Sequence, residues 1–323
     1  MDKNPAEWRG YMEAIRTIGK FLSSDHQTEL TYTTYLPQSG EPSAILQVSH
    51  GMCEYFERYR PLAEYFCARG IAVCGHDHLG HGTAAQENGT LGFFAEKDGW
   101  RIVPEDVHRL TVRIKELFPE KPVFLLGHSM GSFVVRNVLT KYGTDYAGTV
   151  IMGTSGKNPM ARLAIPIASI IKWVKGGTYR SRFLKNAGFS GFNSRFPDDS
   201  SENAWITGDK THRDRYDADP LCTFTFTVSA YLDLYRMLIA VSSEKWARTL
   251  PKDLPVLLIS GADDPLGKYG EGVRQVYHWL KGAGMQDVSI ELVEKGRHEI
   301  LNDFCRSAVL DLLYAFIGRN IVV

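Results

Sequence analysis

The sequence Gly-His-Ser-Met-Gly at residues 127–131 places Ser129 in a pattern that could carry nucleophilic chemistry. An apolar stretch typical of a strand, residues 123–126, precedes the pentad, and a helical pattern begins near Ser132. A serine on a sharp turn between a strand and a helix adopts a strained backbone, and glycine at the flanking positions leaves room for the two elements to cross. The context favours a nucleophilic serine over a glycine-rich strand end that contains a serine incidentally.

A serine hydroxyl is a poor nucleophile near neutral pH and needs a histidine base that a carboxylate orients. Residues 261–265 read Gly-Ala-Asp-Asp-Pro after one expected strand, and His298 follows the next. The Gly-x-x-Asp spacing favours Asp264 as the acid, with Asp263 stabilising the turn. The loop after residues 149–152 contains no carboxylate. The acid is therefore expected after the later strand, which gives the order Ser, Asp, His.

Acyl transfer also needs backbone N–H groups that stabilise a developing oxyanion. The amide of Met130, directly after the serine, is one expected donor. Residues 49–54 read Ser-His-Gly-Met-Cys-Glu after an expected strand, which makes the Met52 amide the second. Glu54 and Arg58 are four residues apart and would pair if the loop enters a helix. The sequence leaves open whether this pair supports the loop or contacts a substrate head group.

A second cluster, residues 75–82, reads Gly-His-Asp-His-Leu-Gly-His-Gly. Imidazoles and a carboxylate suit zinc or iron. Interleaved glycines after a strand are a poor way to converge three rings on one ion, however, so we predict a structural turn that supports the oxyanion loop. We expect neither a metal nor an organic cofactor.

Apolar β-branched runs alternate with amphipathic stretches, the pattern of an α/β protein with a mostly parallel sheet. We expect helices at residues 59–69, 105–118 and 132–142, and strands at residues 30–36, 44–49, 71–75, 123–126, 149–152, 256–260 and 288–293. Residues 157–250 show helical patterns without a convincing buried strand and are too long for an ordinary connection. We predict that they form a helical cap inserted into a core made of residues 1–156 and 251–323.

Two helices of the predicted cap are strongly apolar. Residues 160–174 are apolar almost all round, and a later helix places one apolar face at Phe224, Val228, Tyr231, Leu232, Tyr235, Leu238 and Ile239. These faces would either pack on the core or form an acyl pocket and a lid that touches lipid. The sequence does not decide between the two.

Composition excludes several classes of protein. The 323 residues contain 37 Lys and Arg and 37 Asp and Glu, without a Lys/Arg run, so nucleic acid is not an expected partner. Five scattered cysteines indicate neither a disulfide framework nor a zinc site and suit a reducing cytoplasm. Residues 1–20 lack the apolar core of a signal peptide, and residues 163–174 are too short to span a bilayer. We expect a soluble cytoplasmic protein.

Together these motifs resemble the monoacylglycerol lipase and lysophospholipase branch of the α/β-hydrolase superfamily, also labelled serine aminopeptidase S33-like, over about residues 22–318. The segments that carry the resemblance are residues 50–54, 77–82, 127–131, 261–264 and 296–299. Residues 204–238 look closest to bacterial lysophospholipase-like proteins. The resemblance implies Ser129, Asp264 and His298 as the triad and Met52 and Met130 as oxyanion donors. It also implies an α/β-hydrolase fold with an inserted helical cap.

The sequence departs from this family at Cys53, where Gly is usual, and at Tyr55, where His is common. Tyr55 would face the alcohol side of the pocket or support the loop, so the departures bear on preference for glycerol more than on the chemistry. The expected activity is hydrolysis of single-chain acyl esters, monoacylglycerols or lysophospholipids, with transient contact between the cap and a membrane or micelle surface. The alternatives are a small-ester carboxylesterase, an acyltransferase or aminopeptidase of the same fold, and a non-catalytic binding protein.

Overall fold

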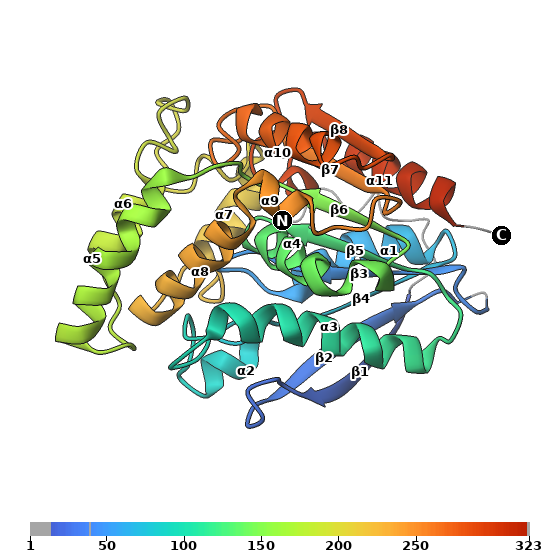
Figure 1. The fold of residues 1–323 in the computed structure, drawn as a ribbon, viewed down its shortest axis with the longest axis horizontal. Helices are drawn as coiled ribbons and strands as arrows, with labels where there is room; N and C mark the ends of the chain where they lie inside the picture. Colours follow the sequence, from blue (N-terminus) through green and yellow to red (C-terminus); the bar gives the residue numbers. More distant parts are fainter. Residues whose placement is uncertain (1–13, 39, 322–323) are drawn as a thin grey trace.

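The computed structural model describes residues 14–38 and 40–321 (Figure 1). Its centre is one eight-stranded sheet in the order β1-β2-β4-β3-β5-β6-β7-β8. β2 is antiparallel to both of its neighbours, and every later pair is parallel. The strands are β1 (Ile15–Leu22), β2 (Glu29–Leu36), β3 (Ala44–Ser49), β4 (Ile71–His76), β5 (Val123–His128), β6 (Gly148–Met152), β7 (Val256–Gly261) and β8 (Val288–Val293).

The sequence predicted seven of these strands and missed β1. Every residue of β3, β4, β5, β6 and β7 is buried, which explains why they are continuous apolar runs. No residue of β1 is fully buried, so it lacks that signal and takes its place by pairing with β2 from Ile15 opposite Leu36 to Leu22 opposite Glu29. Asp25 closes the turn between them by accepting the amides of Gln27 and Thr28, each at 2.8 Å.

Helices cover both faces of the sheet. α1 (Arg60–Cys67), after the short η1 (Phe56–Tyr59), packs with α11 (Arg306–Asn320) against one face. α3 (Gly99–Leu117), α4 (Met130–Tyr142) and α10 (Glu271–Gly282) pack against the other. α3 begins at Gly99 rather than at residue 105, and so contains Pro104. The remaining short elements are α2 (Gly82–Glu87), η2 (Gly143–Asp145) and η3 (Ile300–Asn302).

Five helices lie between β6 and β7: α5 (Pro159–Lys175), α6 (Arg182–Phe189), α7 (Lys210–Ala218), α8 (Val228–Val241) and α9 (Glu244–Ala247). The extended pairing described in this part of the chain is a single bridge between Arg180 and Thr227. α5 and α6 stand to one side of the sheet in Figure 1. α8 links α5 to the core by packing against α5, α4 and α3. This helical arrangement is where the sequence predicted a cap.

Candidate active site

Ser129 occupies a sharp turn between β5 and α4. Its backbone has φ 55° and ψ −120°, a conformation that L-residues adopt only when the surroundings enforce it. The crossing of strand and helix explains the flanking glycines: a Cβ on Gly131 would lie 2.0 Å from the carbonyl oxygen of Ser49, and one on Gly127 would lie 2.3 Å from that of Gly131. Ser129 thus lies at the N-terminus of α4, where the helix dipole favours negative charge.

His298 and Asp264 are in direct contact. Nδ1 of His298 lies 2.9 Å from Oδ2 of Asp264, which is fully buried and also accepts the Ser260 hydroxyl at 3.2 Å and the Leu266 amide at 2.9 Å. Burial disfavours the charged carboxylate, but the charge and hydrogen bond of His298 hold the pKa of Asp264 below its ordinary value. Because a carboxylate accepts from Nδ1–H, the imidazole keeps Nε2 free to act as a base.

Asp263, the other aspartate of this turn, points elsewhere. Its side chain is 40% exposed and lies 3.9 Å from Nη1 of Arg195. Its amide donates to the carbonyl of Gly296 at 2.9 Å, so the residue holds the turn against the loop that carries His298. Of the two candidates that the sequence offered, Asp264 is the one that contacts the imidazole.

The loops that carry Met52 and Met130 meet at Ser129. A Cβ on Gly51 would lie 3.0 Å from the Cβ of Ser129, so the loop after β3 passes directly beside the serine. Met52, Ser129, Met130 and His298 all line one cavity of about 600 Å³. The structure therefore brings both expected oxyanion donors, the serine and the histidine to one place.

The wall of this cavity is largely aromatic and aliphatic. From the predicted apolar face of the cap it takes Phe224, Tyr231, Tyr235 and Leu238. Val228 and Leu232 are buried in the core, and Ile239 packs against it, so this face divides between the two roles that the sequence left open. Trp205, whose ring centroid lies 4.8 Å from that of His298, and Phe189 and Phe192 beside it carry no motif by which the sequence would reveal them.

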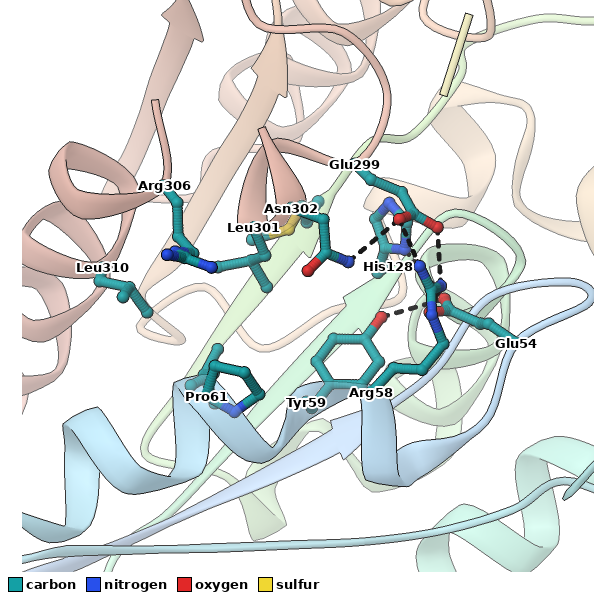
Figure 2. Close-up of a pocket in the computed structure, with 12 residues that line it drawn as sticks. Glu54, Arg58, Tyr59, Pro61, His128, Glu299, Leu301, Asn302, Arg306 and Leu310 are labelled. Atoms are coloured by element: carbon teal, nitrogen blue, oxygen red, sulfur yellow. Dashed lines mark hydrogen bonds and ion pairs between the residues drawn. The ribbon is translucent and has the colours of Figure 1, made fainter. Parts of the chain in front are cut away.

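Glu54 and Arg58 form part of a buried ionic network with Glu299 and His128 (Figure 2). Arg58 makes two hydrogen bonds to Glu299, of 2.8 and 2.7 Å, and one to Glu54 of 3.0 Å. Glu54 also accepts from Tyr59 and from His128, each at 3.0 Å. The space beside the network is about 20 Å³, room for about one water molecule.

The sequence left open whether Glu54, Arg58 and Tyr55 support the loop or contact a substrate head group. The residues that line the large cavity, within the ranges that the structure describes, do not include any of the three. Tyr55 donates instead to Oδ2 of Asp219 at 2.9 Å, which joins the loop after β3 to the helical segment. The contacts fit support of the loop rather than contact with a head group.

The histidine-rich cluster supports the same loop. Nδ1 of His50 lies 2.8 Å from the Gly51 carbonyl, and its Nε2 accepts the His78 amide at 2.9 Å. Burial lowers the pKa of His50 to about 3, so the ring is neutral. His78 contacts the Ser49 hydroxyl at 3.0 Å. Within residues 14–38 and 40–321, no three His, Cys, Asp or Glu side chains converge on a point that could hold a metal.

A comparison of the sequence with protein families identifies the group to which the chain belongs. Residues 40–304 match the family model of serine aminopeptidase, S33. The chain belongs to this family. Human monoglyceride lipase is 29% identical to this S33 chain over 269 residues, which are 83% of the chain and 79% of the relative. Monoacylglycerol lipase of Mycolicibacterium smegmatis is 22% identical over 294 residues, covering 90% and 94%.

Solved structures show the same fold. A carboxyl esterase of Bacillus coagulans, crystallised in complex with glycerol, superposes with a TM-score of 0.90 at 29% identity and covers 95% of this chain and 99% of its own. A lipase in an open form gives a TM-score of 0.88 at 24% identity over 96% and 100% of the two chains. The predicted family and α/β-hydrolase fold are confirmed, and the chain is a serine hydrolase of the lipase and esterase kind. Within the described ranges, no helix is long and apolar enough to cross a membrane.

Proposed function

We propose that the protein hydrolyses single-chain acyl esters, monoacylglycerols or lysophospholipids, through Ser129, His298 and Asp264. The observation that carries the proposal is the large apolar cavity that Ser129 and His298 both line. Asp264 is hydrogen-bonded to Nδ1 of the His298 ring. A cavity of about 600 Å³ is in the range of pockets that enclose small-molecule ligands.

In the proposed mechanism, Oγ of Ser129 attacks the ester carbonyl while its proton passes to Nε2 of His298. Asp264 stabilises the imidazolium, and the Met52 and Met130 amides stabilise the oxyanion. Collapse of the tetrahedral intermediate breaks the bond to the alcohol, which leaves with the proton from Nε2. Water then attacks the acyl-enzyme, again with His298 as base, and releases the carboxylic acid and Ser129. The reaction needs no cofactor.

Two observations support acyl chains as the substrate. Most of the surface of the wall around Ser129 is apolar, which suits an apolar chain better than a polar one. Relatives along most of the chain are named monoglyceride lipases, and the similar Bacillus coagulans esterase was crystallised with glycerol. A small-ester carboxylesterase remains the nearest alternative, because a roomy pocket also admits short acyl groups.

Action on peptides with a free amino terminus fits less well. The carboxylates that line the cavity are Glu202, Asp217 and Glu299. Glu299 is neutralised by Arg58, and Asp217 accepts hydrogen bonds from Ser201 and Asn203. The Glu202 side chain is 90% exposed. None of the three is therefore placed as a buried, available partner for an ammonium group.

We further propose that residues 157–250 act as the cap and that α5 contacts a lipid surface. Its inner face buries Ala161 and Ala168 against the rest of the protein. Its outer face exposes between 44% and 87% of six large side chains, Met160, Leu163, Ile167, Ile170, Trp173 and Val174. Residues 157–197 contain eight Lys and Arg and no Asp or Glu. An apolar helix face among cations suits an interface with anionic lipid.

A fluorophosphonate reacts covalently with activated serines and tests the nucleophile directly. We expect the wild type to gain one adduct by intact mass and Ser129→Ala to gain none. Ser169→Ala, which changes a serine on exposed α5, is the matched control and should label like the wild type. An unlabelled wild type, or an equal adduct on Ser129→Ala, would show that the nucleophile is wrongly assigned.

The acyl group is tested with p-nitrophenyl esters of increasing chain length, beside monoacylglycerol and lysophosphatidylcholine. We expect kcat/KM to rise with chain length from acetate to medium chains, because each buried CH₂ contributes about 0.8 kcal/mol of apolar transfer energy. A sharp preference for acetate or butyrate would rule out the lipase proposal and leave the small-ester carboxylesterase.

A further inference from the structure

Glu54 is linked, directly or through one side chain, to the three loops on which the proposed chemistry depends. Its carboxylate accepts the amide of Gly51, in the loop that carries Met52. It also accepts from the ring of His128, the residue before Ser129. Through Arg58 it is joined to Glu299, the residue after His298. One buried carboxylate thus links the loops that follow β3, β5 and β8 (Figure 2).

Each ring nitrogen of His128 lies next to a hydrogen-bond acceptor. Its Nδ1 lies 3.0 Å from Oε1 of Glu54, and its Nε2 lies 3.2 Å from the backbone carbonyl oxygen of His298. A neutral imidazole carries one N–H and can satisfy only one of these acceptors, whereas an imidazolium satisfies both. Glu54 in turn receives four donors, from Gly51, Arg58, Tyr59 and His128, which suits an ionised carboxylate.

The charges of the network support the same protonation state. It contains two carboxylates, Glu54 and Glu299, and the cation Arg58, all buried or nearly so. With His128 protonated the four charges cancel, whereas a neutral His128 would leave a net negative charge in the interior, which is costly. Burial alone would lower the pKa of His128, but Glu54 raises it above its ordinary value.

We propose that Glu54 and His128 are positioning residues that form a buried carboxylate–imidazolium pair holding the oxyanion loop, the Ser129 turn and the His298 loop in register. The inference rests on the proposed function, because it assigns the pair a role in aligning that triad. The pair acts through backbone groups: Glu54 fixes the Gly51 amide, and His128 fixes the His298 carbonyl. The other titratable groups that interact with the pair are Arg58, Tyr59, Glu299, His50 and the His298 ring, whose centroid lies 4.9 Å from that of His128.

The first test measures the charge of His128 in the wild-type protein by NMR of ¹⁵N-histidine, with His128→Asn to assign its signals. We expect both ring nitrogens to stay protonated at a pH above the ordinary histidine pKa of about 6.5, where an ordinary histidine is mostly neutral. Loss of a ring proton with a midpoint at or below that ordinary value would overturn the proposal. This measurement requires no activity, so it stands whether or not the proposed substrate is right.

The second test measures alignment with Glu54→Gln, which keeps the shape of the side chain and removes its charge. The amount of active protein is the amount that fluorophosphonate labels when the reaction is complete. We expect kcat for p-nitrophenyl butyrate, calculated per labelled serine, to fall about 10- to 100-fold. KM should stay within about twofold, because Glu54 does not line the cavity in the described ranges. The labelling rate should fall in parallel with kcat.

The matched control is Glu64→Gln, which removes a carboxylate from an ion pair with Arg60 at the surface of α1 and should leave kcat unchanged. In Glu54→Gln, His128 loses its counter-charge and deprotonates at lower pH, so the remaining rate should decline with rising pH where the wild type does not. An unchanged kcat per labelled serine in Glu54→Gln would refute a positioning role. Failure of the wild type to label would instead count against the proposed function.

Discussion

Two neighbouring aspartates of the same turn differ, at the scale of single residues, in burial and direction. Asp264 is fully buried and bonded to His298, whereas Asp263 is 40% exposed and faces Arg195. The adjacent imidazole outweighs burial and lowers the pKa of Asp264, so its carboxylate is charged across the neutral range. A stable negative charge there fixes the tautomer that leaves Nε2 of His298 available.

Replacing each aspartate with asparagine separates their roles. We expect Asp264→Asn to reduce kcat for p-nitrophenyl butyrate by on the order of 10³- to 10⁴-fold, because an amide can favour the wrong imidazole tautomer. The control Asp263→Asn should stay within about threefold, since an exposed ion pair contributes little. A comparable loss of kcat in both variants would show that catalysis depends on the conformation of the turn rather than on the Asp264 carboxylate.

The pH dependence follows from the lowered pKa of Asp264. Its contribution to stability is fully present above the ordinary value of 3.8 and is lost as the pH falls from there through the lowered pKa. Wild-type stability measured by urea unfolding should therefore decline in this acidic range, and Asp264→Asn should show a smaller decline. Parallel curves for the two proteins would contradict this assignment.

At the scale of elements, the crossing of β5 and α4 sets the position of Ser129. The strand and the helix approach so closely that a methyl group at Gly131 would overlap the Ser49 carbonyl. The same approach holds the serine backbone in its strained conformation, because α4 begins at Met130 without an intervening loop. Sequence rules for a strand-turn-helix describe this unit well, since all of its determinants lie within a few residues of each other.

Two glycine-to-alanine substitutions test this crossing. Gly131→Ala should lower the free energy of unfolding by about 1–3 kcal/mol or more through overpacking, and it should abolish labelling of Ser129. Gly318→Ala, in α11 where a Cβ would meet nothing within 4 Å, should raise stability by about 0.5–1 kcal/mol. Urea unfolding measures both values. A stable, active Gly131→Ala protein would show that the crossing can relax.

At the scale of the whole molecule, the helical residues 157–250 form both an apolar wall of the cavity and an apolar outer surface. α8 contributes Tyr231, Tyr235 and Leu238 to the cavity wall, while α5 leaves its large apolar side chains exposed. The cations around α5 are spread between apolar residues rather than consecutive, so the sequence shows no basic run although the segment carries net positive charge. This arrangement supports the proposal that α5 meets a lipid surface.

Vesicle binding tests that proposal. We expect the protein to bind vesicles with anionic lipid more tightly than neutral vesicles, and the binding to weaken with salt. The double variant Ile170→Ser and Trp173→Ser should bind at least about tenfold more weakly. Burying each of the two apolar side chains in lipid would contribute roughly 1.5–3 kcal/mol to the free energy of binding. Hydrolysis of the water-soluble p-nitrophenyl butyrate should be unchanged.

The control for vesicle binding is Val112→Ser, which removes another exposed apolar side chain from α3. It should bind like the wild type. Equal loss in both proteins, or no loss in the double variant, would rule out α5 as the contact surface. A change of oligomeric state without a change in binding would indicate that α5 packs against a second copy of the chain.

Local patterns of apolar and glycine residues were enough to predict the family, seven of the eight described strands and the loops that contain Ser129, Asp264 and His298. The sequence did not predict β1, because this strand has no buried residue and is held by its pairing with β2. The pairing of Arg58 with Glu299, 241 positions apart, depends on the tertiary structure, and so do the contact of the Trp205 ring with His298 and the exposed face of α5. The physical reason is that parallel strands bring the loops at their carboxyl ends together, and which side chains meet there depends on the packing of the whole sheet and its helices.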